Sequence, residues 1–160
     1  PGVGGHCIAV DPWFIVSSAP EEAKIIRLAR QVNDGKPKWV LEKAKSAIVE
    51  VLGENPGRSM SDVKVACFGL VFKPDIDDLR ESPALAITRS LASLGCRVLA
   101  VEPHIDALPT DLVTSTINLC SAEEALSTAD VVCVLVKHTA FQTVRTDLHA
   151  ARKLIDVVGI

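Results

Sequence analysis

The residues best suited to chemistry lie at the start of the chain, where three glycines precede a cysteine. Gly2, Gly4 and Gly5 give a backbone that can adopt positive φ and approach a ligand closely, and they lead to Cys7. Asp11 follows four residues later, close enough in sequence to share a pocket with the sulfur and to orient a water or move a proton there. The spacing therefore predicts a presented nucleophile, Cys7, with Asp11 as its polar partner.

Two other interpretations of this segment stay open. A single cysteine is commonly a small buried hydrophobe without chemistry. A metal site of His6, Cys7 and Asp11 is also conceivable, but adjacent His and Cys side chains diverge and no further ligand pair with zinc-like spacing follows, so we expect no metal. We expect residues 1–17 to form a loop that carries the candidate catalytic Cys7. The apolar run at residues 13–16 is expected to anchor this loop to a core.

A second group of charged residues follows a short apolar run that ends at Gly69. Lys73 and Arg80 enclose three aspartates, before a helix start at Ser82 and Pro83. Loops at this position in an open α/β sheet line the ligand crevice, where these two cations could bind phosphate. A solvated loop whose charges neutralise one another explains the same pattern. The loop lacks the G-x-G-x-x-G pattern of a dinucleotide-binding turn.

A long helical segment links the two regions. Apolar residues recur along it with helical spacing, and Ser18 is placed as the N-cap of a capping box with Glu21. Pro37 interrupts the pattern, so the alternatives are two helices or one kinked helix, and we favour one kinked helix over residues 18–54. A small domain cannot cover a helix of this length, so its other face is expected to pack on a second copy in a homodimer.

Beyond a turn-rich connection at residues 53–59, strands alternate with helices. The expected strands are residues 63–69, 97–101, 131–136 and 153–156, and the expected helices are residues 83–94, 121–129 and 139–144. This alternation predicts an α/β domain over residues 62–160 with a parallel sheet and right-handed crossovers. Ligands are expected at the carboxyl ends of its strands.

The composition excludes several classes of partner. The chain has 160 residues and a formal net charge of -3, and no basic patch or long apolar run points to nucleic acid or a membrane. Its five cysteines show no C-x-x-C spacing, and four of them lie in or beside apolar runs, which is typical of reduced, buried thiols in the cytoplasm. The chain starts without Met or a signal peptide, so we expect a piece of a longer protein.

Two segments of the sequence resemble one enzyme family. The segment from Gly4 to Phe14, GGHCIAVDPWF, resembles the catalytic cysteine loop of the UDP-glucose/GDP-mannose dehydrogenases, whose general form is Gly-Gly-Ser-Cys followed four residues later by Asp. The segment from Phe68 to Pro83, FGLVFKPDIDDLRESP, resembles a second block of the same family, in the same order and at about the same spacing. His in place of Ser before the cysteine is similar to the branch that oxidises UDP-N-acetylhexosamines, and the continuation after Cys7 is most similar to members acting on the N-acetyl-D-mannosamine sugar.

The resemblance implies roles for particular residues. Phe72 and Lys73 match positions that hold the nucleotide sugar, Gly4 matches a backbone position beside the sugar, and Arg80 matches an arginine that reaches NAD. Val158 departs from the family, which typically has a basic residue before the final glycine. Residues 62–160 are therefore expected to form a Rossmann-like UDP-sugar-binding domain behind a linking and dimerisation helix.

The resemblance also implies the reaction. It is the four-electron oxidation of the sugar C6 alcohol to a carboxylate with two NAD, through a thiohemiacetal and a thioester on Cys7, for surface polysaccharide biosynthesis. The N-terminal NAD-binding domain is absent from the chain, so we expect this fragment alone to be inactive. The alternatives are a dehydrogenase of UDP-N-acetylglucosamine or UDP-glucose, and a non-catalytic nucleotide-sugar-binding or dimerisation module.

Overall fold

A five-stranded parallel sheet forms the centre of the fold. The computed structural model describes residues 1–110, 112 and 116–160. The strands are ordered β3-β2-β1-β4-β5, and every neighbouring pair is parallel. Their bounds are Lys64–Phe68 for β1, Arg97–Val101 for β2, Ile117–Leu119 for β3, Val131–Val134 for β4 and Leu154–Asp156 for β5. The parallel α/β sheet expected from the sequence is confirmed, and β3 is a further short strand that the apolar pattern did not indicate.

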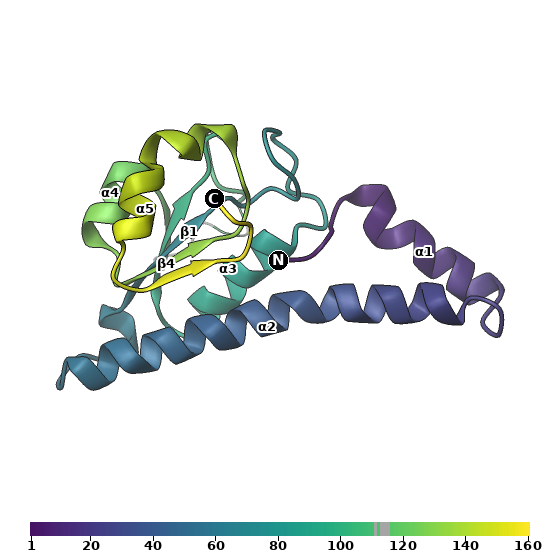
Figure 1. Cartoon of the computed structure of the whole chain (residues 1–160), viewed down its shortest axis with the longest axis horizontal. Coiled ribbons are helices and arrows are strands. Elements are labelled where there is room, and N and C mark those ends of the chain that lie inside the picture. Colours follow the sequence, from purple (N-terminus) through teal and green to yellow (C-terminus); the bar gives the residue numbers. More distant parts are fainter. Residues whose placement is uncertain (111, 113–115) are drawn as a thin grey trace.

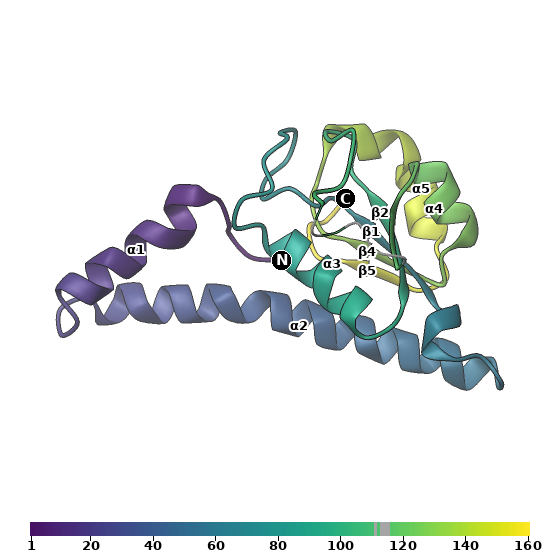
Figure 2. The same cartoon turned by 180° about the vertical axis from the view of Figure 1, so that it is seen from behind.

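Helices cover both faces of the sheet. The long helix α2 (Lys24–Glu54) and α3 (Pro83–Ser93) lie on one face, while α4 (Ala122–Thr128) and α5 (Arg145–Ala150) lie on the other, as Figures 1 and 2 show from opposite sides. Alternate strand residues enter two separate cores, because successive side chains of a strand point to opposite faces. In β1, Val65 and Cys67 join the core beneath α2 and α3, whereas Ala66 and Phe68 join the core beneath α4 and α5.

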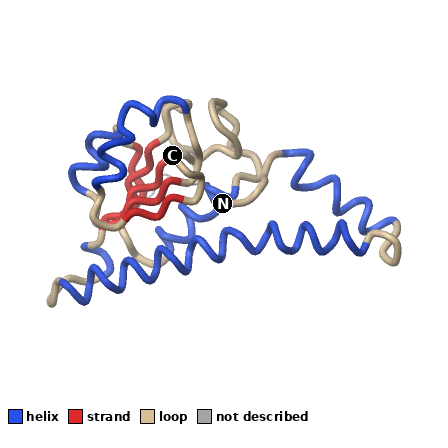
Figure 3. The backbone as a smooth tube through the Cα atoms, viewed as in Figure 1, coloured by secondary structure: helices blue, strands red, loops and turns tan. Residues whose placement is uncertain are grey.

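Helix α2 is continuous through Pro37, so the prediction of one helix instead of two is confirmed, although the helix begins at Lys24 and not at residue 18. Its second half buries one face against the domain, through the core residues Val40, Ala44, Ile48 and Val51. Its first half extends beyond the sheet, and Figure 3 shows α2 as the longest helix of the molecule. The chain therefore combines an α/β domain with a long arm.

The first helix was not expected from the sequence. Residues 1–5 form an extended glycine segment, but α1 spans His6–Ser18 and folds back along the first half of α2. The prediction of a loop through residue 17 is therefore wrong. No strong helix breaker lies between Gly5 and Pro12, so the helix can start at His6.

Two smaller expectations for this region are also wrong. Ser18 does not cap the long helix, because it is the last residue of α1, where its hydroxyl donates to the Phe14 carbonyl; α2 begins only at Lys24. Of the apolar run at residues 13–16, only Val16 is buried, because α1 extends away from the sheet and leaves Phe14 66% exposed.

The remaining helix ends follow local signals. Ser82 caps α3 by accepting a hydrogen bond from the Leu85 amide, and Gly95 follows that helix with φ 92°. Ser121 caps α4 in the same way through the Glu124 amide. None of the helices in the described part of the chain is long and apolar enough to cross a membrane.

Burial keeps the two cysteines in the middle of the sheet unreactive. Cys67 and Cys133 lie opposite each other on β1 and β4, and both are completely buried. Burial raises the pKa of Cys67 to about 12, and it also raises the pKa of Cys133 well above its ordinary value. Cys7 differs from them because it is exposed.

Candidate active site

The glycine segment packs directly against the loop that follows β1. A Cβ on Gly4 would lie 2.2 Å from the Glu81 carbonyl oxygen and 2.5 Å from Cδ of Pro83, and a Cβ on Gly5 would lie 2.8 Å from the Phe72 ring. Gly5 also has φ 97°, a conformation that side chains rarely adopt. The two segments singled out in the sequence therefore meet, and the contact depends on glycine.

Helix α2 holds the glycine segment from the other side. The Asn33 side chain forms two hydrogen bonds with Val3: Oδ1 accepts from the Val3 amide at 2.7 Å, and Nδ2 donates to the Val3 carbonyl at 3.0 Å. The buried Arg30 donates through Nη1 to the carbonyl of Ile8 at 3.4 Å. That carbonyl lacks its usual helical donor because the residue four positions on is Pro12. The clamp formed by Asn33 and Arg30 thus fixes the start of α1.

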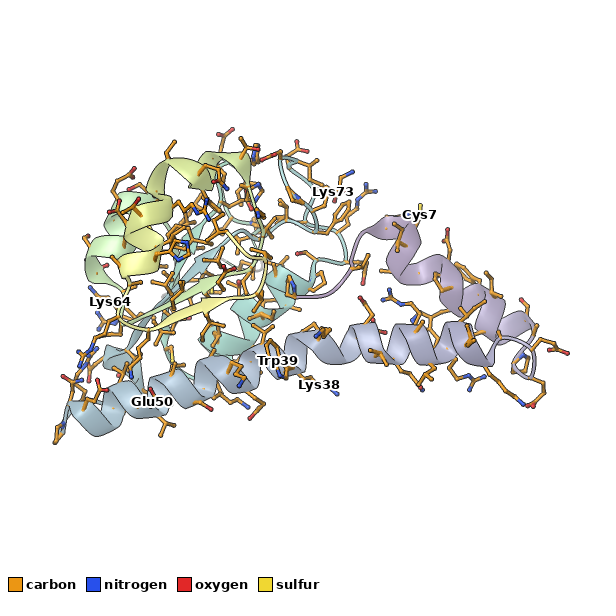
Figure 4. All side chains as sticks on the ribbon, in the orientation of Figure 1. Cys7, Lys38, Trp39, Glu50, Lys64 and Lys73 are labelled. Carbon is orange, nitrogen blue, oxygen red and sulfur yellow. The ribbon has the colours of Figure 1, made fainter. Side chains whose placement is uncertain are left out.

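Cys7 and Asp11 lie one helical turn apart on α1. Residues at this spacing occupy the same face of a helix, and both side chains are exposed. The Cys7 Sγ lies 3.8 Å from Nδ1 of His6. Figure 4 shows Cys7 at the start of α1, on the side of the molecule that faces away from α2. Lys73 lies on that same side. The thiol is exposed on a helix and not on the predicted loop, and its role as the nucleophile stays a prediction.

Arg80 and Asp78 form an ion pair beside the start of α1. The guanidinium donates to both carboxylate oxygens, with distances of 2.7–3.0 Å. Hydrogen bonds from Arg80 lower the pKa of Asp78 to about 2, and the same pair raises the pKa of Arg80, to which the charge of Cys7 adds a smaller increase. Arg80 thus lies within electrostatic range of Cys7, and 66% of its side chain remains exposed.

Phe72 and Lys73 line a pocket at the carboxyl ends of β1 and β4. Its volume is about 280 Å³, and Lys137 and Val158 form other parts of its wall. The Lys73 ammonium lies 5.7 Å from the centroid of the Phe72 ring. The structure therefore places a pocket where ligands of open α/β sheets bind, and it brings Phe72 to the glycine segment.

A buried carboxylate anchors the base of this loop. The Glu102 side chain is fully buried and accepts hydrogen bonds from the backbone amides of Leu70, Val71 and His104, at 2.7, 3.2 and 3.1 Å, and from Nε2 of His138 at 3.1 Å. Burial by itself raises the pKa of Glu102, but the hydrogen bonds from His138 and Leu70 outweigh it, so the pKa lies below its ordinary value. Glu102 is therefore a satisfied buried anion.

His138 extends this network to the middle of the loop. Its Nδ1 accepts the Asp75 amide at 3.0 Å, so its proton lies on Nε2, facing Glu102. The Asp75 carboxylate accepts from the Thr139 amide and hydroxyl at 2.8 and 2.6 Å. Asp75, His104 and His138 have potential metal-ligand atoms within 4.8 Å of one another, but both ring nitrogens of His138 already have hydrogen-bond partners. We interpret the cluster as a network that positions the loop.

Sequence reasoning missed the residues that hold the site together. Glu102 and His138 follow the carboxyl ends of β2 and β4, so their position in the alternating pattern was the available signal. Asn33 and Arg30 lie within a long helix, and no local pattern distinguishes them from other polar residues there. The expected residues Gly4, Phe72 and Arg80 are gathered around the start of α1, whereas Lys73 faces the neighbouring pocket.

Comparison with known proteins gives a consistent result. Residues 66–160 match a sequence model described as the UDP-glucose/GDP-mannose dehydrogenase family, UDP binding domain. Over its whole length the chain is 49% identical to the UDP-N-acetyl-D-mannosamine dehydrogenase of Salmonella typhi, of which it covers 38%, and 51% identical to the NDP-N-acetyl-D-galactosaminuronic acid dehydrogenase of Ralstonia solanacearum, of which it covers 36%.

A solved structure agrees with these relatives. The UDP-N-acetyl-mannosamine dehydrogenase of S. aureus superimposes with a TM-score of 0.68 at 34% identity, over 96% of this chain and 32% of that one. The chain matches the C-terminal part of these proteins and spans 32–38% of their length.

Proposed function

This chain belongs to the UDP-glucose/GDP-mannose dehydrogenase family, and we propose that it is the C-terminal part of an NAD-dependent UDP-N-acetyl-D-mannosamine 6-dehydrogenase. The enzyme would oxidise the C6 alcohol of the sugar to a carboxylate, giving a uronate for surface polysaccharide biosynthesis. In this proposal residues 1–17 carry the nucleophile, residues 18–54 link the domains and residues 62–160 bind the UDP-sugar.

One observation supports this proposal above the others, namely the contact between the glycine segment and the loop after β1. Gly4 and Gly5 pack against Glu81 and Phe72, more than sixty residues away in sequence, so a sugar held near Phe72 would have its far end close to Cys7. A covalent mechanism needs a nucleophile held at a fixed position relative to the bound substrate. The packing of glycine on a ring and a carbonyl supplies that position.

Cys7 has the chemistry for the second half of the reaction. Its thiolate would add to the C6 aldehyde carbon to form a thiohemiacetal, whose oxidation leaves a thioester. Water would then attack the thioester carbonyl, releasing the carboxylate product and regenerating the thiol. Asp11, one turn further along the same helix, would orient or deprotonate that water.

The nucleotide sugar would occupy the pocket beside this loop. Lys73 supplies a cation for the substrate phosphates, Phe72 supplies an apolar wall, and the backbone at Gly4 lies against the sugar. The network of Glu102, His138 and Asp75 would keep the loop in the conformation that presents these groups.

Arg80 is the residue that we assign to NAD. When bound, NAD would supply the hydride acceptor for both oxidations. The guanidinium of Arg80 lies near Cys7 and is largely exposed. Its Nε and Nη2 donate to Asp78, and Nη1, which has no acceptor among the described residues, would be the donor for a cofactor phosphate. The dinucleotide itself would be held by an N-terminal domain outside this chain.

The free face of α2 supports a homodimer. Ile25, Val32 and Trp39 recur every seven residues and are exposed, and Leu28 and Val49 extend the same stripe. Heptad spacing of exposed apolar residues is typical of helices that pair with a second copy. We expect Val32→Glu to convert the dimer to a monomer in analytical ultracentrifugation, whereas an unchanged dimer would show that the stripe is not the interface.

A substrate panel tests the proposed function. The full-length protein that carries this chain would be supplied with limiting UDP-N-acetylmannosamine, UDP-N-acetylgalactosamine, UDP-N-acetylglucosamine or UDP-glucose, and NADH would be followed by absorbance. We expect two NADH per sugar with the mannosamine substrate and none with Cys7→Ser. Preference for the galactosamine substrate would instead indicate that the protein shares the sugar specificity named for the Ralstonia relative.

Other outcomes would contradict the mechanism. Sustained formation of two NADH per sugar by Cys7→Ser would remove Cys7 as nucleophile. One NADH per sugar in the wild type would remove the thioester step. Binding of UDP-sugars without any NADH would favour a non-catalytic binding module.

A further inference from the structure

Lys137 is exposed and lines the pocket assigned above to the nucleotide sugar. It follows β4, where the amides of Leu135 and Val136 both donate to the carbonyl of Phe68, at 2.9 and 3.1 Å. These bonds prolong the alignment of β4 with β1 past the last paired residues. Lys137 is thereby carried to the carboxyl edge of the sheet, beside the loop that bears Lys73.

Close packing fixes the separation of the two segments that carry these lysines. A Cβ on Gly69 would lie 2.4 Å from Cβ of Val136, so only glycine permits this approach. Gly69 also has φ 90°, which favours glycine for a second reason. Lys73 and Lys137, which follow these two packed segments in the chain, line one pocket of about 280 Å³.

The charge of Lys137 is not neutralised in the described part of the chain. Its ammonium donates to the carbonyl of Gly159, which is a neutral acceptor. Neither Lys137 nor Lys73 forms an ion pair with a carboxylate of the described residues. Asp156, the last residue of β5, instead accepts hydrogen bonds on its carboxylate from the amides of Val158, Gly159 and Ile160. Two uncompensated cations share a pocket in a chain whose net charge is -3.

We propose that Lys137 is a second cation for the diphosphate of the nucleotide sugar, acting together with Lys73. This inference rests on the proposed function and adds a binding residue to it. In a nucleotide sugar the diphosphate is attached at C1, at the opposite end of the sugar from the reacting C6. The residues that bind the diphosphate should therefore lie apart from Cys7, and the lining of the pocket includes both lysines but not Cys7. A lysine held only by a carbonyl can turn to a phosphate oxygen and gain a charge-assisted hydrogen bond.

The test measures the affinity of the full-length protein for UDP and for uridine by calorimetry. Lys137→Ala should weaken UDP binding by about tenfold to a hundredfold, because a hydrogen bond to a charged group is lost, and leave uridine binding unchanged. Lys137→Arg should restore most of the affinity. Lys64→Ala is the matched control, since it removes the same charge at the opposite end of β1, as Figure 4 shows, and should bind UDP as the wild type does.

The outcomes separate this inference from the proposed function. If Lys73→Ala weakens UDP binding but Lys137→Ala does not, the assignment of Lys137 is wrong and the UDP-sugar pocket stands. If Lys137→Ala weakens UDP and uridine equally, Lys137 shapes the pocket and does not bind the diphosphate, which also overturns the inference. If the wild type binds neither ligand and forms no NADH, the proposed function itself fails.

Discussion

The contact at Gly4 gives the sharpest test of how the candidate site is assembled. A Cβ at this position would lie 2.2 Å from the carbonyl oxygen of Glu81, whereas ordinary contacts begin at 3.4 Å. In Gly4→Ala the two segments would therefore have to separate by roughly 1 Å, which a close-packed interior resists.

Neither segment can retreat without losing other interactions. On one side, Glu81 already has φ 49°, and the Ser82 hydroxyl donates to the Leu70 carbonyl at 2.6 Å. On the other side, Asn33 holds Val3 by two hydrogen bonds. Overpacking of this kind costs about 1–3 kcal/mol, and we expect Gly4→Ala to lower the free energy of unfolding of the chain by that amount.

Urea unfolding followed by circular dichroism measures this change, with Gly35→Ala as the control. Gly35 lies inside α2, where an added Cβ meets no atom within 4 Å. Alanine there should raise the free energy of unfolding by about 0.5–1 kcal/mol, because glycine weakens a helix interior. The two Gly→Ala changes should thus have opposite signs. A stability loss for Gly4→Ala below about 0.5 kcal/mol, the usual range of surface changes, would refute the reasoning.

Three further predictions concern charged groups. The Arg58 guanidinium holds the pKa of Asp130 below its ordinary value, so the ionised Asp130 stabilises the fold at pH values above that ordinary value. Asp130→Asn should therefore lower the free energy of unfolding at pH 7, and the difference from the wild type should shrink as the pH falls below about 4. A difference that stays constant with pH would contradict this. Arg80→Ala should return the pKa of Asp78 from about 2 toward its ordinary value, as measured by carboxyl NMR titration; an unchanged pKa would show that the pair does not form. Glu102→Ala leaves four donors without their acceptor and should lower the free energy of unfolding by about 3–5 kcal/mol in urea, so a loss near zero would mean that water replaces the carboxylate.

Helix ends show both the success and the limit of local signals. Ser82 and Ser18 each precede a proline and an apolar helical pattern, and both were expected to be N-caps. The prediction is correct for Ser82, which caps α3 and also donates to a buried carbonyl. It is wrong for Ser18, because the residues before it are already helical and Val16 packs in the interior. A capping pattern does not reveal whether the preceding segment is free.

The sequence by itself determined the α/β class, the parallel sheet and the two segments that meet at the candidate site. These follow from apolar strands, helical periodicity and glycine, whose effects act over a few residues. Only the tertiary structure decided that Asn33 clamps Val3, 30 residues away, and that His138 and Glu102, 36 residues apart, support the loop after β1. The reason is that such partners are brought together by the alignment of whole helices and strands, which no local spacing encodes.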